Sequence, residues 1–458
     1  MNQPDISNMD VCVKDAMEAA LDKNRGPADP TDFGDLYTRL TAAEGKIPPL
    51  YRDRVYQPFV KTLDELSEKG FNELLRRDPR REQAAGLLLD IAQAILQNGE
   101  GYEETATDAF QEVVSDLYDG YLSAADRKGI KPPDLSVTAP LVKWGRPEYG
   151  PYTWTIGAAS HFGLASGIVN LPPSHARCGL LGWSALSHET AGHDILHADT
   201  GLLKELALTI RERLLKENFS ANLANYWSQR ADETASDVMG ILHMGPAAGI
   251  GLIGYFRGLN GAWSGKPVLR NTGPEHAPHP VDLLRGYLAA GVVLLLHFDQ
   301  ADSWADAILA ETDKDLTAIQ LGRHSIDADT ARRSAAVVAQ AVAESPLKSL
   351  EQHALSQIQN WRNEDEEIAD QIRMHLYTGS DLHECHVSGM YAAHVVAACV
   401  TSGLEKGADV PRIFEGMLTL LKAMHDANPS WGPLYVNHPG DLILHRAYQI
   451  PGREQVAG

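Results

Sequence analysis

One eleven-residue stretch, residues 187–197, constrains this chain more than any other part of its sequence. It reads Ser-His-Glu-Thr-Ala-Gly-His-Asp-Ile-Leu-His and carries three imidazoles and two carboxylates. The surrounding residues 180–198 follow a helical pattern of apolar residues, so we expect the stretch to lie on a helix. Imidazole and carboxylate groups are common ligands of divalent metals in proteins. The sequence therefore predicts a helix that contributes to a metal site.

The spacing of two of these histidines makes a geometric demand on that helix. His188 and His193 are five residues apart. On a regular α-helix, side chains five residues apart diverge by about 140°, whereas side chains four residues apart diverge by only about 40°. Both imidazoles can bind one ion only if the helix is locally widened, as in a π-bulge. Gly192 lies where such a widening would be easiest to accommodate.

The string His-Glu-Thr-Ala-Gly-His at residues 188–193 resembles the His-Glu-x-x-Gly-His motif of the dipeptidyl peptidase III family. That motif has the same extra residue and the same glycine before its second histidine. The resemblance implies one zinc ion bound by His188 and His193, with Glu189 as the general base toward the zinc-bound water. It covers six residues, so it carries over only the local geometry.

A second string, Arg-Ala-Asp-Glu-Thr-Ala-Ser-Asp at residues 230–237, offers a third ligand. Glu233 and Asp237 are four residues apart and share one face of a helix. The string resembles the Asn-Glu-x-x-Ser-Asp motif of thermolysin-like peptidases, with Asp232 in place of the asparagine. The resemblance implies that Glu233 is a zinc ligand and that Asp237 orients His188 through its other ring nitrogen. The alternative reading is an ordinary acidic helix face.

A third string, Glu-His-Ala-Pro-His-Pro-Val-Asp-Leu-Leu-Arg at residues 275–285, follows in the same order. It is similar to the His-Pro-x-x-x-x-Arg segment of the prenyl-protein (CAAX) endoproteases and their soluble relatives. The resemblance implies that His279 or Arg285 lies near the substrate carbonyl oxygen, where charge develops in the transition state. We take His279 as the donor. Alternatively, His276 and His279 cap the helix that follows.

Two short segments are the best strand candidates, residues 152–156 (Tyr-Thr-Trp-Thr-Ile) and 166–171 (Ser-Gly-Ile-Val-Asn-Leu). Gluzincin peptidases place an antiparallel edge strand beside the active helix, and the resemblance implies that residues 166–171 form it. The expected fold is mainly α, with a small antiparallel β-sheet beside the active-site helix. It amounts to a gluzincin-like (zincin) core embedded in helical domains.

The chain has 458 residues, enough for two or three domains. The character of the sequence changes near residue 142, where helical periodicity gives way to β-prone segments and later returns. We therefore expect a helical region over residues 1–145, a zincin-like catalytic core over residues 146–300 and a second helical region over residues 301–458.

The net charge of −21 argues against nucleic acids and anionic membranes as partners, because both would repel the chain. No apolar run reaches the length of about 18 residues that a membrane span needs. The first residues lack the pattern of a secretory signal, and the four cysteines are scattered without a Cys-x-x-Cys pair. These features favour a soluble cytoplasmic protein with reduced thiols. The oligomeric state is not readable.

The same stretch also allows a different metal chemistry. The doublet His193-Asp194 is typical of HD-domain proteins, which are all-helical phosphohydrolases, or oxygenases when they bind two irons. Such a site needs an upstream histidine and a later aspartate, for which the candidates are His161 or His175 and Asp237 or Asp299. This reading leaves Glu189 and Glu233 without a role.

Two further alternatives stay open. His193 and His197 could be the ligand pair, with Asp194 in the place of the general base, although its side chain is one methylene shorter than glutamate. We expect Asp194 and His197 instead to support the site or to cap the helix. A non-catalytic metal-binding scaffold is also conceivable, and the intact Glu189 weighs against it.

The C-terminal histidines His383, His386 and His394 form a second group. They could bind another metal or line a cleft, but histidines on helices are more often ordinary packed residues. A set of large aromatic side chains is expected in the core: Trp183, Trp227, Trp263 and Tyr255.

Taken together, the motifs favour a hydrolase that uses one zinc ion to cleave a peptide or a small amide. The donor set also suits iron, manganese or nickel.

Overall fold

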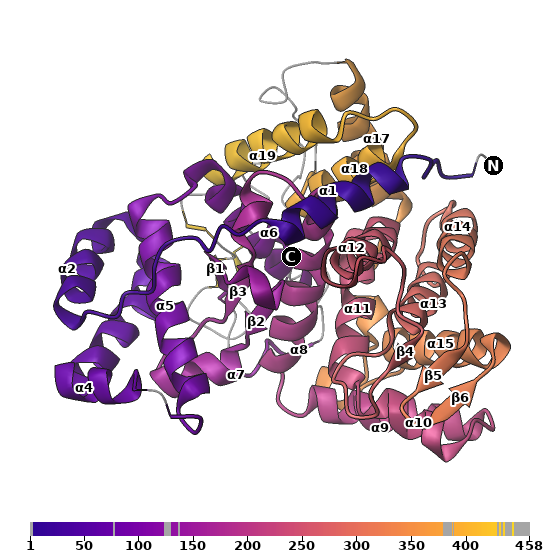
Figure 1. The fold of residues 1–458 in the computed structure, drawn as a ribbon, viewed down its shortest axis with the longest axis horizontal. Coiled ribbons are helices and arrows are strands. Elements are labelled where there is room, and N and C mark those ends of the chain that lie inside the picture. Colours follow the sequence, from indigo (N-terminus) through magenta and orange to yellow (C-terminus); the bar gives the residue numbers. More distant parts are fainter. Residues whose placement is uncertain are drawn as a thin grey trace.

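The computed structural model of the chain describes residues 3–76, 78–122, 130–135, 138–378, 387, 389–427, 430–431, 434–435 and 442–443. Most of these residues are helical, and the strands are short (Figure 1). The expectation of a mainly α protein is therefore confirmed. No helix in the described part of the chain is long and apolar enough to cross a membrane.

The longer helices are α1 (Met9–Leu21), α2 (Phe33–Ala43), α4 (Gln57–Leu74), α5 (Glu82–Glu100), α6 (Glu104–Leu122), α9 (Leu202–Lys216), α10 (Ala221–Ser228), α11 (Ala231–Met244), α12 (Pro246–Ser264), α13 (Asp282–Val293), α14 (Ala301–Asp313), α15 (Ala328–Ala343), α17 (Asn363–Thr378), α18 (Ala392–Leu404) and α19 (Val410–Asp426). Four short helices are α3 (Pro49–Tyr51), α7 (Ile156–Ala159), α8 (Ile195–Ala198) and α16 (Leu355–Ile358).

The main sheet has three strands, β1 (Leu141–Trp144), β2 (Tyr152–Trp154) and β3 (Ile168–Leu171), in the order β1-β3-β2. β1 pairs with β3 in parallel, and β2 pairs with β3 in antiparallel orientation. The expected antiparallel sheet is therefore wrong, and the sheet is mixed. The chain crosses from β1 through β2 and α7 before it enters β3, so β1 and β3 run in the same direction.

This order also changes which strand is at the edge. Residues 166–171 were expected to form the edge strand, but β3 lies in the centre, with a neighbour on each side. The outer strand next to the candidate site is β2. Two smaller sheets complete the described strands: β4 (Thr272–Gly273) with β5 (Ile319–Leu321) and β6 (His324–Ile326), and β7 (Leu434–Tyr435) with β8 (Leu442–Ile443).

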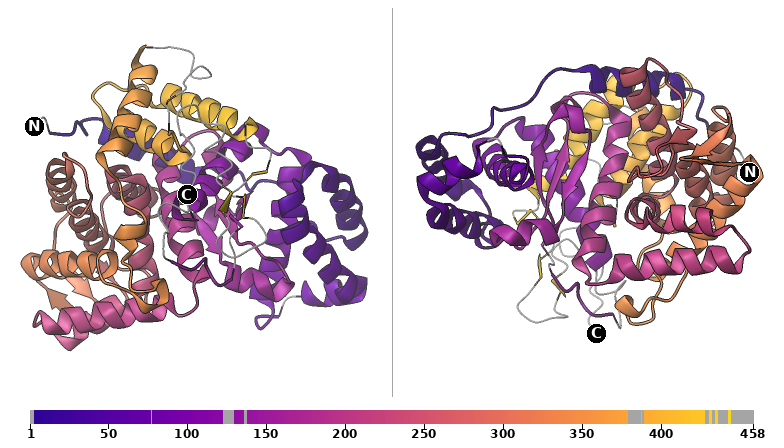
Figure 2. Two further views of the ribbon diagram at one scale, coloured as in Figure 1. Left: turned by 180° about the vertical axis from the view of Figure 1, so that it is seen from behind. Right: turned by 60° about the horizontal axis from the view of Figure 1, so that its bottom comes forward.

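The main sheet lies between α5 on one side and α6 and α11 on the other (Figures 1 and 2), and an apolar cluster packs on each face. Val142 and Trp144 of β1 pack into a large cluster that includes side chains of α6, α11, α12 and α18. Leu141 and Ile168 pack into a second cluster with α2, α4 and α5. Because both faces are covered, every residue of β1 and β3 is buried, including the polar Lys143 and Asn170. The domain boundaries expected near residues 145 and 300 stay a prediction.

The helix expected over residues 178–198 is divided into three pieces. A 3₁₀-helix (Leu180–Ser184) comes first, then a π-helix, η7 (Ser187–Asp194), and then α8. η7 packs closely against α11 because a glycine on each helix removes a side chain from the contact. A Cβ on Gly192 would lie 2.5 Å from Ser236 Cα, and a Cβ on Gly240 would lie 2.9 Å from Ser187 Oγ.

Three of the four aromatic residues expected in the core are buried, namely Trp183, Trp227 and Tyr255. Trp263 is 60% exposed, so that expectation is wrong for it. It lies in the last turn of α12, where the helix runs out beyond the apolar cluster.

Candidate metal centre

The π-helix η7 brings His188 and His193 together. A π-helix closes hydrogen bonds between residues five apart, so side chains at that spacing come to lie on one side of it. The two imidazole ring centres are 4.8 Å apart, and the ring planes are nearly perpendicular. The widening that the spacing demanded is therefore present, and it covers Gly192.

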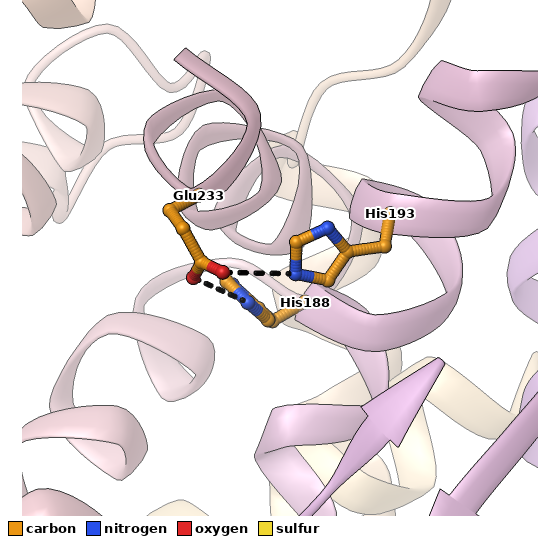
Figure 3. A group of neighbouring side chains, drawn as sticks. All are labelled: His188, His193 and Glu233. Atoms are coloured by element: carbon orange, nitrogen blue, oxygen red, sulfur yellow. Dashed lines mark ion pairs between the residues drawn. The ribbon is translucent and has the colours of Figure 1, made fainter. Parts of the chain in front are cut away.

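Glu233 reaches both imidazoles from α11 (Figure 3). Its Oε2 lies 3.4 Å from His188 Nε2, and its Oε1 lies 3.5 Å from His193 Nε2. Ligand atoms about 2.05 Å from a tetrahedral ion are separated from each other by about 3.3 Å. The spacing of these donors therefore fits a single ion between them, and the three residues form one of two groups in the described chain that could hold a metal.

The carboxylate of Glu233 is nearly buried and is held in its ionised form. Burial would raise its pKa, but the close approach of His188 and the positive charges of His193, His188 and Arg285 outweigh it and lower the pKa far below the usual value. Glu233 Oε2 is also a buried oxygen that accepts no hydrogen bond of good geometry from the described residues. A buried, ionised and unsatisfied oxygen between two imidazoles suits a cation.

His188 is oriented from behind by Asp237 and Arg285. Its Nδ1 donates to Asp237 Oδ1 over 2.8 Å, so that Nε2 faces Glu233. Burial lowers the pKa of His188, but the bonds to Asp237 and Glu233 dominate and raise it to about 10. The orienting role that the resemblance to thermolysin-like peptidases implied for Asp237 stays a prediction, and the contact from His188 Nδ1 is the one it requires.

Arg285 is buried and donates to Asp237 through Nε at 2.7 Å and Nη2 at 2.6 Å. Its guanidinium lies over the Phe256 ring, 4.4 Å from the ring centre. The Asp237 carboxylate outweighs the effect of burial and raises the pKa of Arg285. The side chain was expected near the substrate carbonyl oxygen. It lies instead behind His188, where it supports the His188–Asp237 pair.

His193 has a corresponding support on the other side of the site. Asp232 accepts from His193 Nδ1 and, with its second oxygen, from His197 Nε2, each over 3.0 Å. A proton on Nδ1 leaves His193 Nε2 free for a metal. Asp232, His193 and His197 also form the second group that could itself hold an ion. The sequence analysis predicts a supporting role for His197. It does not predict one for Asp232, which it names only as the residue in place of the motif's asparagine.

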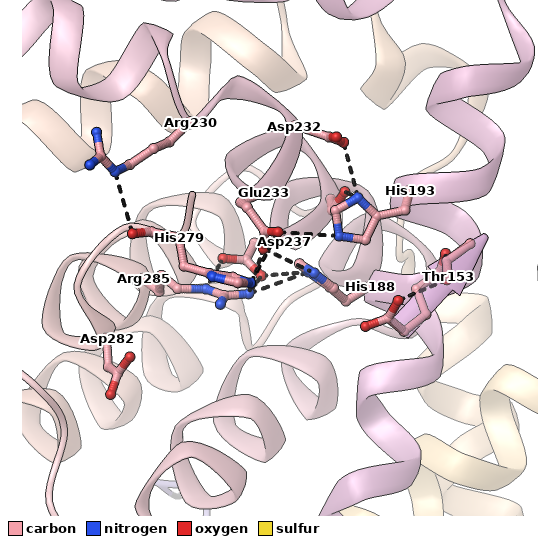
Figure 4. A network of polar contacts seen from close by, with 12 residues as sticks. Thr153, His188, His193, Arg230, Asp232, Glu233, Asp237, His279, Asp282 and Arg285 are labelled. Atoms are coloured by element: carbon pink, nitrogen blue, oxygen red, sulfur yellow. Dashed lines mark hydrogen bonds and ion pairs between the residues drawn. The ribbon is translucent and has the colours of Figure 1, made fainter. Parts of the chain in front are cut away.

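Glu189 is held by a residue of the sheet. Thr153, in the middle of β2 (Figure 4), donates its hydroxyl to Glu189 Oε2 over 2.7 Å. Its Oγ1 also lies 3.1 Å from the backbone oxygen of Glu189. The sequence does not single out Thr153, because it predicts residues 166–171 as the edge strand. The period-two alternation of a strand at residues 152–156 was the signal that could have found it.

His279 stands at the solvent side of the centre and is about half exposed. Its Nε2 lies 3.2 Å from Glu233 Oε1. The loop before α13 is held by Arg230, which donates to the backbone oxygens of His279 at 3.3 Å and Glu275 at 2.8 Å. Burial lowers the pKa of His279, so its neutral form is favoured. His276 is exposed in the same loop.

The residues that an HD-type site requires are not gathered here. Asp194 is fully buried and accepts from Tyr118 Oη at 2.7 Å and from Ile156 N at 3.0 Å, so it anchors η7 to the start of α7. Burial raises its pKa to about 6. Neither of the two groups that could hold a metal in the described residues includes Asp194, His161, His175 or Asp299.

The C-terminal histidines do not join the centre in the part of the chain that the structure describes. His383 and His386 lie outside the described residues. His394 is buried at the start of α18, where its Nε2 pairs with Asp365 Oδ1 at 3.0 Å and its Nδ1 accepts from Tyr391 N at 2.9 Å. These bonds explain its burial without a metal.

Comparisons with known proteins give no neighbour from which a role could be transferred. No protein-family model matches the chain, and neither does any curated protein or solved structure. The roles of these residues therefore depend on their own chemistry and geometry.

Proposed function

We propose that this protein is a zinc-dependent hydrolase of gluzincin type, most consistent with a metallopeptidase that cleaves peptides or small amides. The observation that carries the proposal is the π-helix η7, which turns two imidazoles five residues apart toward one buried carboxylate, Glu233. His188, His193 and Glu233 would hold the ion. Such a donor set with two histidines and one glutamate, beside a further glutamate, is typical of zinc peptidases.

When bound, zinc supplies a Lewis acid that polarises a carbonyl group and makes a water molecule more acidic. Glu189 acts as the general base: it takes a proton from the attacking water and later passes it to the leaving amine. Thr153 occupies Glu189 Oε2, so Oε1 is the oxygen left to handle that proton. The hydroxyl of Thr153 also fixes the direction in which the carboxylate points.

His279 is the candidate donor to the substrate carbonyl oxygen. It is the half-exposed imidazole at the centre, and its neutral form can donate one hydrogen bond where charge develops. Arg285, Asp237 and Asp232 act through the ligand histidines and do not face the substrate. The outer edge of β2 offers backbone groups with which an extended substrate can pair.

The test combines metal analysis with two substitutions. The purified protein should contain one equivalent of metal. Glu189→Gln should keep that metal and lose activity on a peptide mixture by about 10²–10⁴-fold, the range expected for a general base. Glu233→Ala should lose the metal. Glu212, exposed on α9, provides the matched controls Glu212→Gln and Glu212→Ala, which should change neither.

Three results would count against the proposal. Retention of metal by Glu233→Ala, together with its loss in Asp194→Ala, would favour the HD-type reading. Hydrolysis of phosphate esters but of no peptide or amide would point the same way. Purified protein without metal, and without affinity for zinc, would indicate a non-catalytic protein that inherited the fold without its metal site.

A further inference from the structure

We propose that three aromatic residues beside β2 bind an aromatic side chain of an extended peptide substrate, next to the bond that is cleaved. These residues are Tyr149, Tyr152 and Trp154, and we refer to them as the aromatic wall. The inference rests on the proposed peptidase function and adds a substrate class to it.

The first argument is the alternation of side chains along β2. Successive side chains of a strand point to opposite faces of the sheet. Thr153 points toward η7, where it bonds Glu189. Tyr152 and Trp154 point to the opposite face, where both bond Asp90 of α5. The candidate metal centre and the aromatic wall therefore lie on opposite faces of β2.

The second argument concerns the backbone at the outer edge of β2. The carbonyl oxygen of Tyr152 accepts from Asn170 Nδ2 in β3, and that of Trp154 lies 2.9 Å from the position a Cβ on Gly167 would take. Both oxygens thus point inward, to β3. Because the backbone groups of a strand alternate in direction, those of Thr153 point outward.

A peptide that pairs with the outward groups of Thr153 has a defined orientation. Residues opposite each other in a pair of strands carry their side chains on the same face. The substrate residue opposite Thr153 therefore points toward Glu189, and its neighbours along the peptide point to the face of Tyr152 and Trp154. Diagonal neighbours in paired strands lie about 7–8 Å apart, within reach of aromatic side chains.

The aromatic wall is held rigidly before any ligand arrives. Asp90 Oδ2 accepts from Tyr152 Oη at 2.8 Å and from Trp154 Nε1 at 2.7 Å, and Asp90 itself is buried against Lys143. The rings of Tyr149 and Tyr152 meet edge to face, and so do those of Tyr152 and Trp154. Rings fixed in this way lose little freedom when a ligand binds.

The wall lines a cavity of about 960 Å³ between β2 and the start of α5. Besides the rings, its lining includes the apolar side chains of Leu75, Pro79 and Leu89. The lining also holds two arginines and three acids, and three of these five side chains are already paired: Arg146 with Asp29, Asp78 with Arg80, and Asp90 with Lys143. Only Arg76 and Glu82, of opposite sign, are left, so the cavity selects by shape and stacking rather than by charge. A flat, uncharged ring is the side chain that fits it.

The experiment is a cleavage profile of the zinc-loaded full chain on a mixture of peptides, read by mass spectrometry. We expect Phe, Tyr and Trp to be enriched at one position adjacent to the cleaved bond. A matched pair of peptides that differ only by Phe or Ala at that position should then differ by at least tenfold in kcat/KM, mainly through KM.

Two variants connect the preference to the wall. Trp154→Ala should reduce the Phe-over-Ala preference to less than threefold. Tyr149→Ala should reduce it as well, and this ring is 60% exposed, so its removal leaves the core intact. Trp263→Ala is the matched control, because Trp263 is an equally exposed aromatic residue on α12, outside the wall. It should keep the full preference.

The outcomes separate this inference from the proposed function. If the wild-type protein cleaves no peptide, both fail. If it cleaves peptides without an aromatic preference, or prefers basic side chains, only the wall is wrong. If the preference is present but survives in both Tyr149→Ala and Trp154→Ala, the aromatic side chain binds elsewhere and the wall is again wrong.

Discussion

Asp232 uses its two oxygens to hold two histidines, His193 and His197. Removing that carboxylate frees the ring of His193 to turn and to change its tautomer. We expect Asp232→Ala to weaken zinc binding about 10- to 100-fold, the usual effect of losing such a partner. Asp232→Asn should lose less zinc affinity than Asp232→Ala, because the amide oxygen can still accept a hydrogen bond from one imidazole. Competition with a chromophoric chelator measures the affinity.

The stoichiometry in the same titration provides the check. One ion per chain in the wild type and in both variants agrees with a supporting role for Asp232. Two ions in the wild type and one in Asp232→Ala would show that this carboxylate is itself a ligand. Asp329→Ala, at an exposed position on α15, is the control and should bind zinc normally.

Thr153 makes a second residue-scale prediction. Its hydroxyl donates to the Glu189 carboxylate, and a hydrogen bond to a charged group contributes about 1.5–3 kcal/mol. Thr153→Val keeps the shape and removes the donor, so kcat should fall by roughly 10- to 100-fold. KM and metal content should stay unchanged, and Thr153→Ser should restore most of kcat. Loss of metal in Thr153→Val, or no recovery of kcat in Thr153→Ser, would mean that Thr153 acts through packing and not through the hydrogen bond from its hydroxyl to Glu189.

At the scale of elements, the π-helix η7 depends on its contact with α11. A Cβ on Gly192 would come within 2.5 Å of Ser236 Cα, which is backbone and cannot move aside cheaply. We expect Gly192→Ala to reduce the free energy of unfolding by about 1–3 kcal/mol, the usual cost of overpacking, and to weaken metal binding. Denaturant unfolding and metal analysis test this.

Gly45→Ala is the control for this substitution, since a Cβ there has open space around it. If Gly192→Ala unfolds like the wild type and keeps its metal, the two helices are less tightly coupled than their backbone approach suggests.

The sequence predicted the elements of the site unevenly. The five-residue spacing of His188 and His193 required a widened helix, because no other helix would aim both rings at one point. The place of Thr153 could not be predicted in this way, since strand order is decided by contacts between distant segments. The same limit caused β3 to be taken as an edge strand. Arg285 shows a further limit. The motif at residues 275–285 predicts that Arg285 lies near the metal ligands, but it does not tell whether the side chain faces the substrate or packs behind His188.

At the scale of the whole molecule, two buried histidines make stability depend on pH. Burial lowers the pKa of His175 and that of His243 to about 4 each, and the Nε2 of each has no partner among the described residues. The unfolded chain, with ordinary histidine pKa values near 6.5, binds these protons more readily. The contribution of these two neutral histidines to the free energy of unfolding is therefore fully present above about pH 6.5 and is lost as the pH falls toward 4.

Each of these histidines should contribute up to about 3 kcal/mol of that loss. Urea unfolding between pH 7 and pH 4 measures it. His243→Gln should flatten the dependence, because the glutamine does not titrate, whereas the exposed control His161→Gln should leave the slope unchanged. An unchanged slope in His243→Gln would contradict the assignment.

The helical class of the molecule followed from periodicity, since apolar spacing along one helix is a local property. The mixed sheet and the two apolar clusters were not predictable in the same way. They depend on which helices face each side of β1 and β3, and residues far apart in the chain decide this.

The packing of α1 has a consequence for how this fold is assembled during synthesis. Asn8 donates to Leu404 O and, through its side chain, to Gly403 O, a partner 395 residues away. Ala16 fits against Gly258 of α12. At a synthesis rate of about 5–20 residues per second, α1 waits roughly 20–80 seconds for α18 to be made. α1 is thus synthesised well before both α12 and α18, and its apolar face lacks its native cover until those helices follow.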